Sequence, residues 1–194
     1  MISGAIKRLT DFILALLVLI ILSPVLLVGC LVVLVTMGWP VIFMHERSGR
    51  NGLPFRMIKL RTMLIDPDGK MTDSERITRT GLLLRKFSID ELPQLLNVLA
   101  GSMSLVGPRP LLREYDVHYS AEQSRRLLAK PGLTGLAQVT GRNNLSWDEK
   151  LALDVQYVDT QSFWLDMKIL MKTPVVVVTA RDFKRSGEAT KFSE

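Results

Sequence analysis

The chain has 194 residues, of which 47% are hydrophobic and 23% are charged, and its formal net charge is +6 at pH 7. This length accommodates one domain with a sizeable core and one appendage. The single cysteine, Cys30, excludes an intramolecular disulfide. Because so hydrophobic a chain also carries many charges, we expect its apolar residues to be concentrated in one segment.

That segment is residues 12–35, which contain no charged side chain. As a helix it would be about 36 Å long, enough to cross a hydrocarbon core of about 30 Å, so we predict a membrane protein. The apolar run continues past Cys30 and is longer than that of a signal peptide, which argues against cleavage there. Beside a membrane segment, basic residues more often meet anionic membrane lipids or phosphorylated substrates than nucleic acid. We therefore expect no nucleic acid partner.

Ser23 and Pro24 divide the apolar segment into two arms of about eleven residues each. Proline lacks an N–H group and clashes with the preceding helical turn, so we expect a kink at this point. Both flanks of the segment are basic, which by the positive-inside rule places both in the cytoplasm. Each arm, about 17 Å long, is too short to cross alone. We therefore predict a re-entrant anchor over residues 1–38, with a kinked membrane span as the alternative.

The rest of the chain, residues 39–194, is predicted to be a cytosolic domain at the membrane interface. Its first part, residues 41–63, has the pattern of two short strands joined by a turn at Asn51-Gly52. A helix is predicted over residues 74–86, where basic residues at its end suit the helix dipole.

Further along, residues 115–129 are predicted to be helical and the glycine-containing residues 130–144 to form a loop. Ser146 and Glu149 have the spacing of a capping box, so a helix should begin there. The tail, residues 162–187, is too charged to span a membrane but suits a position at its interface or under the body. The expected fold is α+β and mostly helical, with a re-entrant membrane helix, a small β-hairpin and amphipathic interfacial helices.

Two adjacent carboxylates, Asp90 and Glu91, precede a short apolar run, and they allow two readings. Ser88 and Glu91 have capping-box spacing, Pro93 suits a first helical turn, and Gly101 suits the end of the helix. This structural reading explains Glu91 but does not need Asp90. In the chemical reading, the pair holds Mg²⁺ together with substrate phosphates, and an ionised Asp attacks phosphorus to give an acyl phosphate.

The chemical reading requires cations that bind phosphate, and the sequence offers four. Arg109 stands between two prolines in "GPRP", which preorganise its backbone for bidentate phosphate recognition. The further candidates are Lys59, Arg85 and Arg142. Each alone is more often a solvated surface charge, but their combination with an acidic pair and a membrane segment favours a phosphate site. The isolated histidines, and the absence of G-x-S-x-G, Walker and G-x-G-x-x-G motifs, argue against zinc, serine hydrolase, P-loop and Rossmann chemistry.

Four blocks of the sequence together resemble the bacterial sugar transferases, the monotopic phosphoglycosyl transferases. They are residues 47–63, 82–112, 130–147 and 153–158. The resemblance implies transfer of a sugar-1-phosphate from a UDP-sugar to undecaprenyl phosphate, with release of UMP and with Mg²⁺ as cofactor. It also implies the cytoplasmic face of the bacterial inner membrane. The chain is similar to the minimal forms, such as the initiating enzyme of bacterial N-linked glycan assembly, which favours an N-acetylated deoxysugar as the donor sugar.

The resemblance also implies roles for individual residues. Asp90 matches the nucleophile that forms a phosphosugar–aspartyl intermediate, and Glu91 matches its acidic partner. Ser23 and Pro24 match the break of the re-entrant helix. The basic motifs of the family contain Lys59, Arg109 and Arg142.

Two positions are left open by the motifs. Asp154 lies in a family block, but a place on a helix face explains it equally well. Ser102 stands where family members often have an acidic residue, and whether this difference alters the site is not indicated.

Two rival readings come from other classes of protein. A non-catalytic membrane adaptor would bind anionic lipids through the basic flanks and would tolerate loss of Asp90. An exported lipoprotein would be acylated at Cys30. The sequence indicates neither the glycan pathway nor the oligomeric state.

Overall fold

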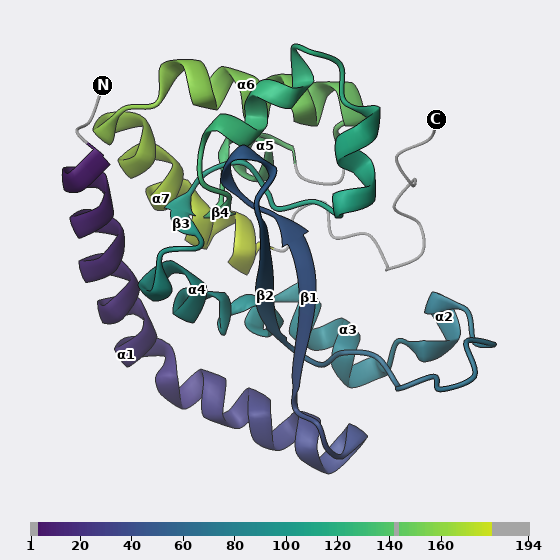
Figure 1. Ribbon diagram of the computed structural model, residues 1–194. Coiled ribbons are helices and arrows are strands. Elements are labelled where there is room, and N and C mark those ends of the chain that lie inside the picture. The colour runs from purple at the N-terminus through teal and green to yellow at the C-terminus, as the bar shows by residue number, and fades with distance from the viewer. Residues whose placement is uncertain (1–3, 142–143, 180–194) are drawn as a thin grey trace.

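The computed structural model describes residues 4–141 and 144–179, and Figure 1 shows their arrangement. The fold is mostly helical, with a long apolar N-terminal helix and two small two-stranded sheets, so the predicted fold class is confirmed at this level. Arg142, one of the four candidate phosphate ligands, lies outside the described residues.

Helix α1 spans Gly4–Met37 and contains the whole charge-free segment, with Pro24 in its interior. The Ser23 hydroxyl donates a hydrogen bond to the Ile20 carbonyl (2.8 Å), so it engages the backbone next to the proline. Figure 1 shows that the helix changes direction about half-way along, as expected of an interior proline. The helix is long and apolar enough to cross a membrane. Whether the bend returns the chain to the face it entered stays a prediction.

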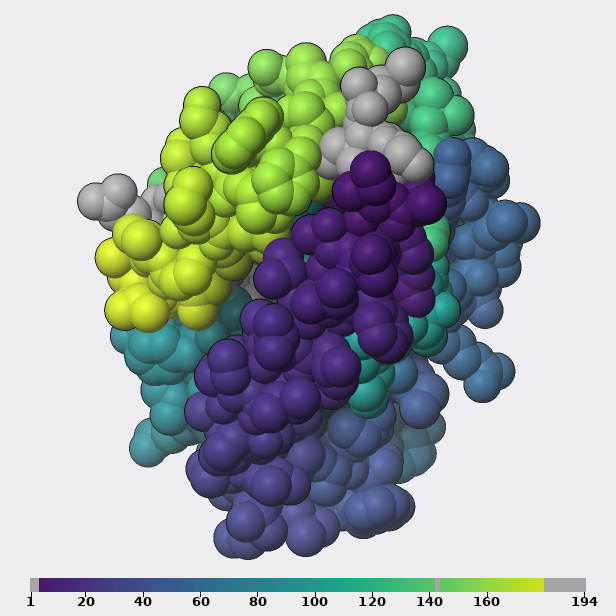
Figure 2. Space-filling model, turned by 90° about the vertical axis from the view of Figure 1, so that its left-hand side faces the viewer, coloured from purple at the N-terminus to yellow at the C-terminus, as the bar shows by residue number. Residues whose placement is uncertain are grey.

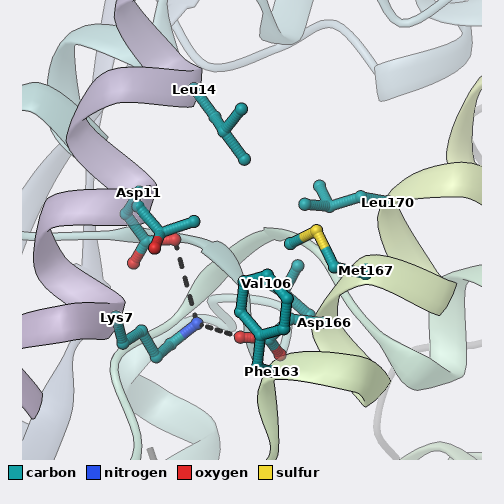
Figure 3. Close-up of a pocket in the computed structure, with 9 residues that line it drawn as sticks. Lys7, Asp11, Leu14, Val106, Phe163, Asp166, Met167 and Leu170 are labelled. Carbon is teal, nitrogen blue, oxygen red and sulfur yellow. Dashed lines mark hydrogen bonds and ion pairs between the residues drawn. The ribbon is translucent and has the colours of Figure 1, made fainter. Parts of the chain in front are cut away.

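The first arm of α1 is held to the body by buried polar contacts (Figure 3). Lys7 Nζ donates to Asp166 Oδ2 (2.7 Å), and the Tyr157 hydroxyl donates to the other oxygen of the same carboxylate (2.7 Å). One turn later, the buried carboxylate of Asp11 accepts a hydrogen bond from Ser104 Oγ (2.7 Å). Because buried charges are stable only when paired, these contacts fix how α1 lies against the body.

The predicted hairpin consists of β1 (Ile42–Ser48) and β2 (Pro54–Leu60), which pair antiparallel. Asn51 (φ 57°) and Gly52 (φ 73°) form the turn, so this expectation is confirmed. Phe55, Met57 and Lys59 alternate along β2 and therefore share one face. Arg47 on β1 pairs with Phe55 and lies on that same face.

The predicted helix over residues 74–86 is divided into α2 (Asp73–Arg76) and α3 (Arg79–Lys86). Between them, Thr78 has extended backbone, and its hydroxyl caps α3 by accepting a hydrogen bond from Gly81 N (2.9 Å). The prediction of one continuous helix is therefore wrong, because a threonine cap starts a new helix at this point.

The carboxylate pair lies on the 3₁₀ turn η2 (Ile89–Glu91), which leads into α4 (Gln94–Ala100). The predicted capping box at Ser88 is wrong. Ser88 adopts a left-handed conformation (φ 55°) and its side chain makes no cap hydrogen bond. Gly101 (φ 89°) ends α4 as expected, because this left-handed position favours glycine.

The second half of the chain surrounds a short parallel pair of strands, β3 and β4. Its elements are β3 (Ser104–Val106), η3 (Arg113–His118), η4 (Gln123–Leu128), β4 (Gly132–Thr134), α5 (Leu136–Thr140), α6 (Trp147–Thr160) and α7 (Phe163–Val178). The segment predicted to be one helix forms the 3₁₀ helices η3 and η4. The capping box at the start of α6 is confirmed by hydrogen bonds in both directions between Ser146 and Glu149.

The prediction of a loop over residues 130–144 is wrong, because β4 and α5 both begin within it. Its glycines serve close packing. A Cβ atom on Gly132 would lie 2.1 Å from the Gly107 backbone nitrogen, so only glycine lets the two backbones meet.

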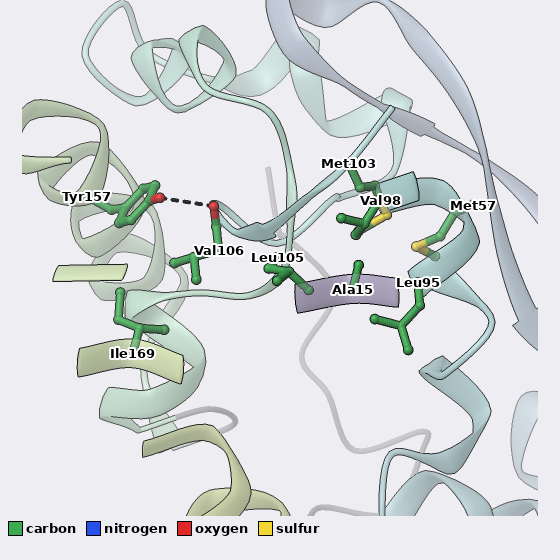
Figure 4. Close-up of a cluster of buried hydrophobic side chains, with 9 residues drawn as sticks. All are labelled: Ala15, Met57, Leu95, Val98, Met103, Leu105, Val106, Tyr157 and Ile169. Carbon is green, nitrogen blue, oxygen red and sulfur yellow. Dashed lines mark hydrogen bonds between the residues drawn. The ribbon is translucent and has the colours of Figure 1, made fainter. Parts of the chain in front are cut away.

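One hydrophobic core joins these elements (Figure 4). It consists of Ala15, Met57, Leu95, Val98, Met103, Leu105, Val106, Tyr157 and Ile169, from α1, β2, α4, β3, α6, α7 and the turn before β3. The Tyr157 hydroxyl, which donates to Asp166, also lies within hydrogen-bonding distance of the Val106 carbonyl (3.0 Å), so its polar end is satisfied within the core. This core fixes β2 and α4 relative to each other, and the carboxylate pair lies between them.

Helix α7 has one buried and one exposed apolar face. Ile169 is buried, whereas Trp164, Met171, Val175 and Val178 are exposed. Figure 2 shows α1 and α7 side by side on one face of the molecule. Helix α7 is therefore amphipathic, and the position of the tail at a membrane interface stays a prediction; residues 180–187 of the tail lie outside the described residues.

Gly81→Ala tests the packing of α3 against the segment that follows β2. A Cβ atom at Gly81 would lie 1.9 Å from the Thr62 carbonyl oxygen, so the helix must shift. We expect the free energy of unfolding to fall by about 1–3 kcal/mol, measured by urea unfolding of the purified chain in detergent. Gly4→Ala is the matched control, because no heavy atom lies within 4 Å of its Cβ position. Equal stability of the two variants would contradict the packing described here.

Candidate active site

The Glu91 carboxylate is held by two cations from distant parts of the chain. Lys59 Nζ on β2 and an Arg109 guanidinium nitrogen both donate to Glu91 Oε1, at 2.7 and 2.8 Å. Burial raises the pKa of Glu91, but the charges of Arg109 and Lys59 outweigh burial and hold this pKa well below its usual range. Glu91 is therefore an ionised partner of two cations rather than the helix cap that the sequence also allowed.

Asp90, its neighbour, has a different environment. It is 5% exposed, and its carboxylate accepts no hydrogen bond from the residues that the structure describes. Burial and the negative charge of Glu91 raise the pKa of Asp90 to about 6, with Lys59 and Arg85 acting in the opposite direction. At neutral pH the carboxylate is ionised and more basic than an ordinary aspartate, which are the properties of a nucleophile.

Arg85 stands behind the pair, in the last turn of α3. Its Nε donates to Thr62 Oγ1 (2.8 Å). Burial lowers the pKa of Arg85, and the charge of Asp90 raises it. The structure thus places Asp90, Glu91, Lys59, Arg85 and Arg109 close enough for their charges to act on one another.

A pocket of about 90 Å³ opens beside Glu91. Its lining consists of Arg47, Met57, Lys59, Glu91, Gln94, Arg109, Pro110 and Leu111. Sequence reasoning did not assign Arg47 or Gln94 to the site. Two features of the sequence indicate them. Arg47 falls on the same face of the hairpin as Lys59, and Gln94 follows Glu91 by three residues, about one helical turn.

The oxygen ligands that the site offers to a cation are the two carboxylates. Within residues 4–141 and 144–179 there is no group of three or more His, Cys, Asp or Glu side chains that could hold a metal. Lys59 and Arg109 both contact Oε1 of Glu91, so Oε2 remains available, as does the Asp90 carboxylate. One or two carboxylates supplemented by substrate phosphates are the usual protein ligands of Mg²⁺, so the residues present fit this ion.

Asp154, the further candidate, lies behind the pocket rather than in its lining. It forms a buried ion pair with Arg126 (2.8 Å), and the same guanidinium nitrogen donates to the Arg109 carbonyl (2.6 Å). Asp154 therefore supports the backbone of a pocket residue from α6.

Ser102 is likewise absent from the pocket lining. Its hydroxyl donates to the Asn97 carbonyl (3.2 Å) and lies 3.3 Å from the Asn97 side-chain amide. That amide in turn bonds to the backbone of β2 through Ile58 and Arg56. Ser102 thus belongs to the junction between α4 and the hairpin.

Asp154→Asn tests this support of Arg109. The change leaves the buried Arg126 cation without a counter-charge, so we expect the free energy of unfolding to fall by about 3–5 kcal/mol, measured by urea unfolding in detergent. Asp159→Asn on the same helix is the control. Its partner, Arg125, is exposed, so the loss should stay below about 1 kcal/mol. A similar small loss in both variants would show that the Arg126–Asp154 pair does not support the fold.

Comparison with known proteins identifies sugar transferases as relatives of this chain. The family model for bacterial sugar transferases matches residues 2–180. The uncharacterized sugar transferase EpsL of Bacillus subtilis is 48% identical over 187 residues, which are 95% of this chain and 93% of that protein.

Two further relatives have names that describe a reaction. The UDP-glucose:undecaprenyl-phosphate glucose-1-phosphate transferase of Caulobacter vibrioides is 42% identical, over 89% of this chain and 70% of its own length. The undecaprenyl-phosphate galactose phosphotransferase of Salmonella typhimurium is 40% identical, over 91% of this chain and 41% of its own length. The family model covers most of the chain, and the three relatives are 48%, 42% and 40% identical to it. The chain therefore belongs to the bacterial sugar transferase family, the phosphoglycosyl transferases that its motifs resemble.

Proposed function

We propose that the chain transfers a sugar-1-phosphate from a UDP-sugar to undecaprenyl phosphate, with release of UMP, through a covalent intermediate on Asp90. The observation that carries this proposal is the contrast within the carboxylate pair. Glu91 is fixed by two cations, whereas Asp90 is buried, more basic than usual, and accepts no hydrogen bond from the described residues. The names of the relatives from Caulobacter vibrioides and Salmonella typhimurium support the substrates.

The reaction proceeds in two displacements at one phosphorus atom. An Asp90 carboxylate oxygen forms a bond to the phosphorus that bears the sugar, and the bond from this phosphorus to the bridging oxygen breaks, with its electron pair leaving on UMP. A phosphate oxygen of the lipid then attacks the same phosphorus, and the bond to Asp90 breaks, which restores the carboxylate. The donor diphosphate and the lipid phosphate, which repel each other, need not meet.

The cations lower the barrier by neutralising charge on the phosphates. Lys59 and Arg109 stand at the pocket with Glu91, and Arg85 stands behind Asp90. Asp90 and Glu91 would hold Mg²⁺, which supplies further neutralisation of phosphate charge. Arg142 remains a proposed phosphate ligand on the basis of its motif.

The proposed setting is the cytoplasmic face of the bacterial inner membrane. A re-entrant anchor over residues 1–38 would hold the catalytic domain, residues 39–194, at the depth of the lipid head groups. The bent, apolar α1 and the exposed apolar face of α7 support this arrangement, because both lie on one side of the molecule.

The donor sugar has two candidates. An N-acetylated deoxysugar is proposed from the resemblance to minimal forms of the family. Glucose or galactose is the second candidate, because the relatives named above act on these sugars. A panel of UDP-sugars, scored for UMP release with undecaprenyl phosphate present, identifies the donor.

Asp90→Asn tests the covalent route. With the accepted UDP-sugar and no lipid, the wild type should release UMP and gain the mass of one sugar-phosphate on Asp90, measured by intact and peptide mass spectrometry. Asp90→Asn should lose the adduct and more than about a thousandfold of the transfer rate, because the amide is not a nucleophile.

Asp159→Asn serves as the control and should keep both activities. Strict dependence of UMP release on the lipid, with no adduct, would indicate direct transfer instead. Full function of Asp90→Asn would favour the non-catalytic adaptor.

Removal of divalent cations tests the proposed cofactor. Chelation by EDTA should lower the rate of UMP release by more than about a hundredfold, because charge neutralisation by a metal contributes several kcal/mol to the transition state. Added Mg²⁺ should restore the rate. An unchanged rate in EDTA would refute the magnesium proposal and leave the covalent route standing.

A further inference from the structure

Arg47 enters the pocket from the hairpin. It lies on the face of the hairpin that also carries Met57 and Lys59, and all three line the pocket beside Glu91. The position of Arg47 makes it a component of the site.

The Arg47 side chain lacks the partners that a buried cation needs. Its Nε is buried and has no hydrogen-bond partner, and the guanidinium forms no ion pair with the residues that the structure describes. Burial and the nearby charge of Arg109 lower the pKa of Arg47 to about 10, so the side chain stays charged at neutral pH. A buried donor without an acceptor is costly, and such a group in a functional pocket points to a ligand.

Gln94 also has a buried donor without an acceptor in the part of the chain that the structure describes. It lies in the first turn of α4, is 3% exposed and lines the same pocket. Its Nε2 is buried and has no acceptor among the described residues. Two unsatisfied donors, from β1 and from α4, therefore converge on one pocket.

The charges of the lining define what these donors would accept. The pocket has three cations, Arg47, Lys59 and Arg109, and one carboxylate, Glu91. Lys59 and Arg109 are both paired with Glu91, whereas Arg47 forms no ion pair with the residues that the structure describes. A phosphate group supplies both the negative charge and several acceptor oxygens, and arginine binds it in a fork.

We propose that Arg47 and Gln94 bind a phosphate group of the substrate in this pocket. This assignment rests on the proposed function and adds two substrate-binding residues to it. The phosphate belongs either to the nucleotide donor or to the lipid acceptor, which share this chemistry.

The test uses the full chain in detergent or nanodiscs and the variants Arg47→Met, Arg47→Lys and Gln94→Leu. Binding of UDP is measured by calorimetry, and KM for undecaprenyl phosphate is measured from UMP release at saturating donor. Arg125→Met is the matched control, because Arg125 is an exposed arginine on η4 that is ion-paired outside the pocket. Thermal stability of each variant is recorded as well.

If the pocket holds the donor phosphate, Arg47→Met should weaken UDP binding about ten- to a hundredfold and leave the KM for the lipid unchanged. If it holds the lipid phosphate, UDP binding stays unchanged and the KM for the lipid rises by a similar factor. Arg47→Lys should recover part of the loss, because lysine keeps the charge but not the fork. Gln94→Leu should weaken the same ligand to a smaller extent.

The thermal stability of the variants distinguishes a role of Arg47 in ligand binding from a role in folding. Arg47→Met removes a partly buried cation whose Nε has no hydrogen-bond partner among the described residues, so its melting temperature should equal or exceed that of the wild type. Unchanged UDP binding and unchanged lipid KM in all three variants would overturn the assignment. A wild type that releases no UMP from any UDP-sugar would instead overturn the proposed function, so the two failures are distinguishable.

Discussion

The contact of one Glu91 oxygen with both Lys59 and Arg109 joins three segments that are far apart in the chain: strand β2, turn η2 and the "GPRP" segment. A carboxylate inside the protein is stable only if opposite charges compensate it. If these segments separated, Glu91 would lose the cations that compensate its charge. The same contact keeps Glu91 ionised. Its charge then acts on Asp90, the next residue, and helps to raise the Asp90 pKa. Two neighbouring carboxylates thus acquire different properties from their surroundings.

A second set of buried polar contacts connects the long apolar helix α1 to this site. Asp11 on α1 accepts a hydrogen bond from Ser104, the first residue of β3. Strand β3 ends at Val106, and the segment that follows it carries Arg109. From the other side, Arg126 and Asp154 hold the Arg109 carbonyl. The backbone of Arg109 is therefore placed between a contact to α1 and a contact to α6. In the proposed membrane setting, the depth of α1 would determine the depth of the site.

Much of the local structure could be predicted, because it depends on neighbouring residues. The long helix follows from a charge-free segment, the hairpin turn from Asn51-Gly52, and the end of α4 from Gly101. The predicted capping box at Ser88 failed because the same spacing is compatible with a left-handed serine when Glu91 has stronger partners elsewhere. The loop prediction over residues 130–144 failed because glycine serves close backbone packing as well as turns.

The sequence by itself determined the long apolar helix, the adjacent carboxylates and the family, since these depend on composition and on short motifs. The tertiary structure alone decided what each group does in the site. It paired Glu91 with two cations, left Asp90 without a hydrogen bond from the described residues, moved Asp154 behind the pocket and added Arg47 and Gln94 to its lining. The physical reason is that the ionisation and reactivity of a carboxylate depend on burial and on charges within a few ångströms, and these neighbours come from distant segments of the chain.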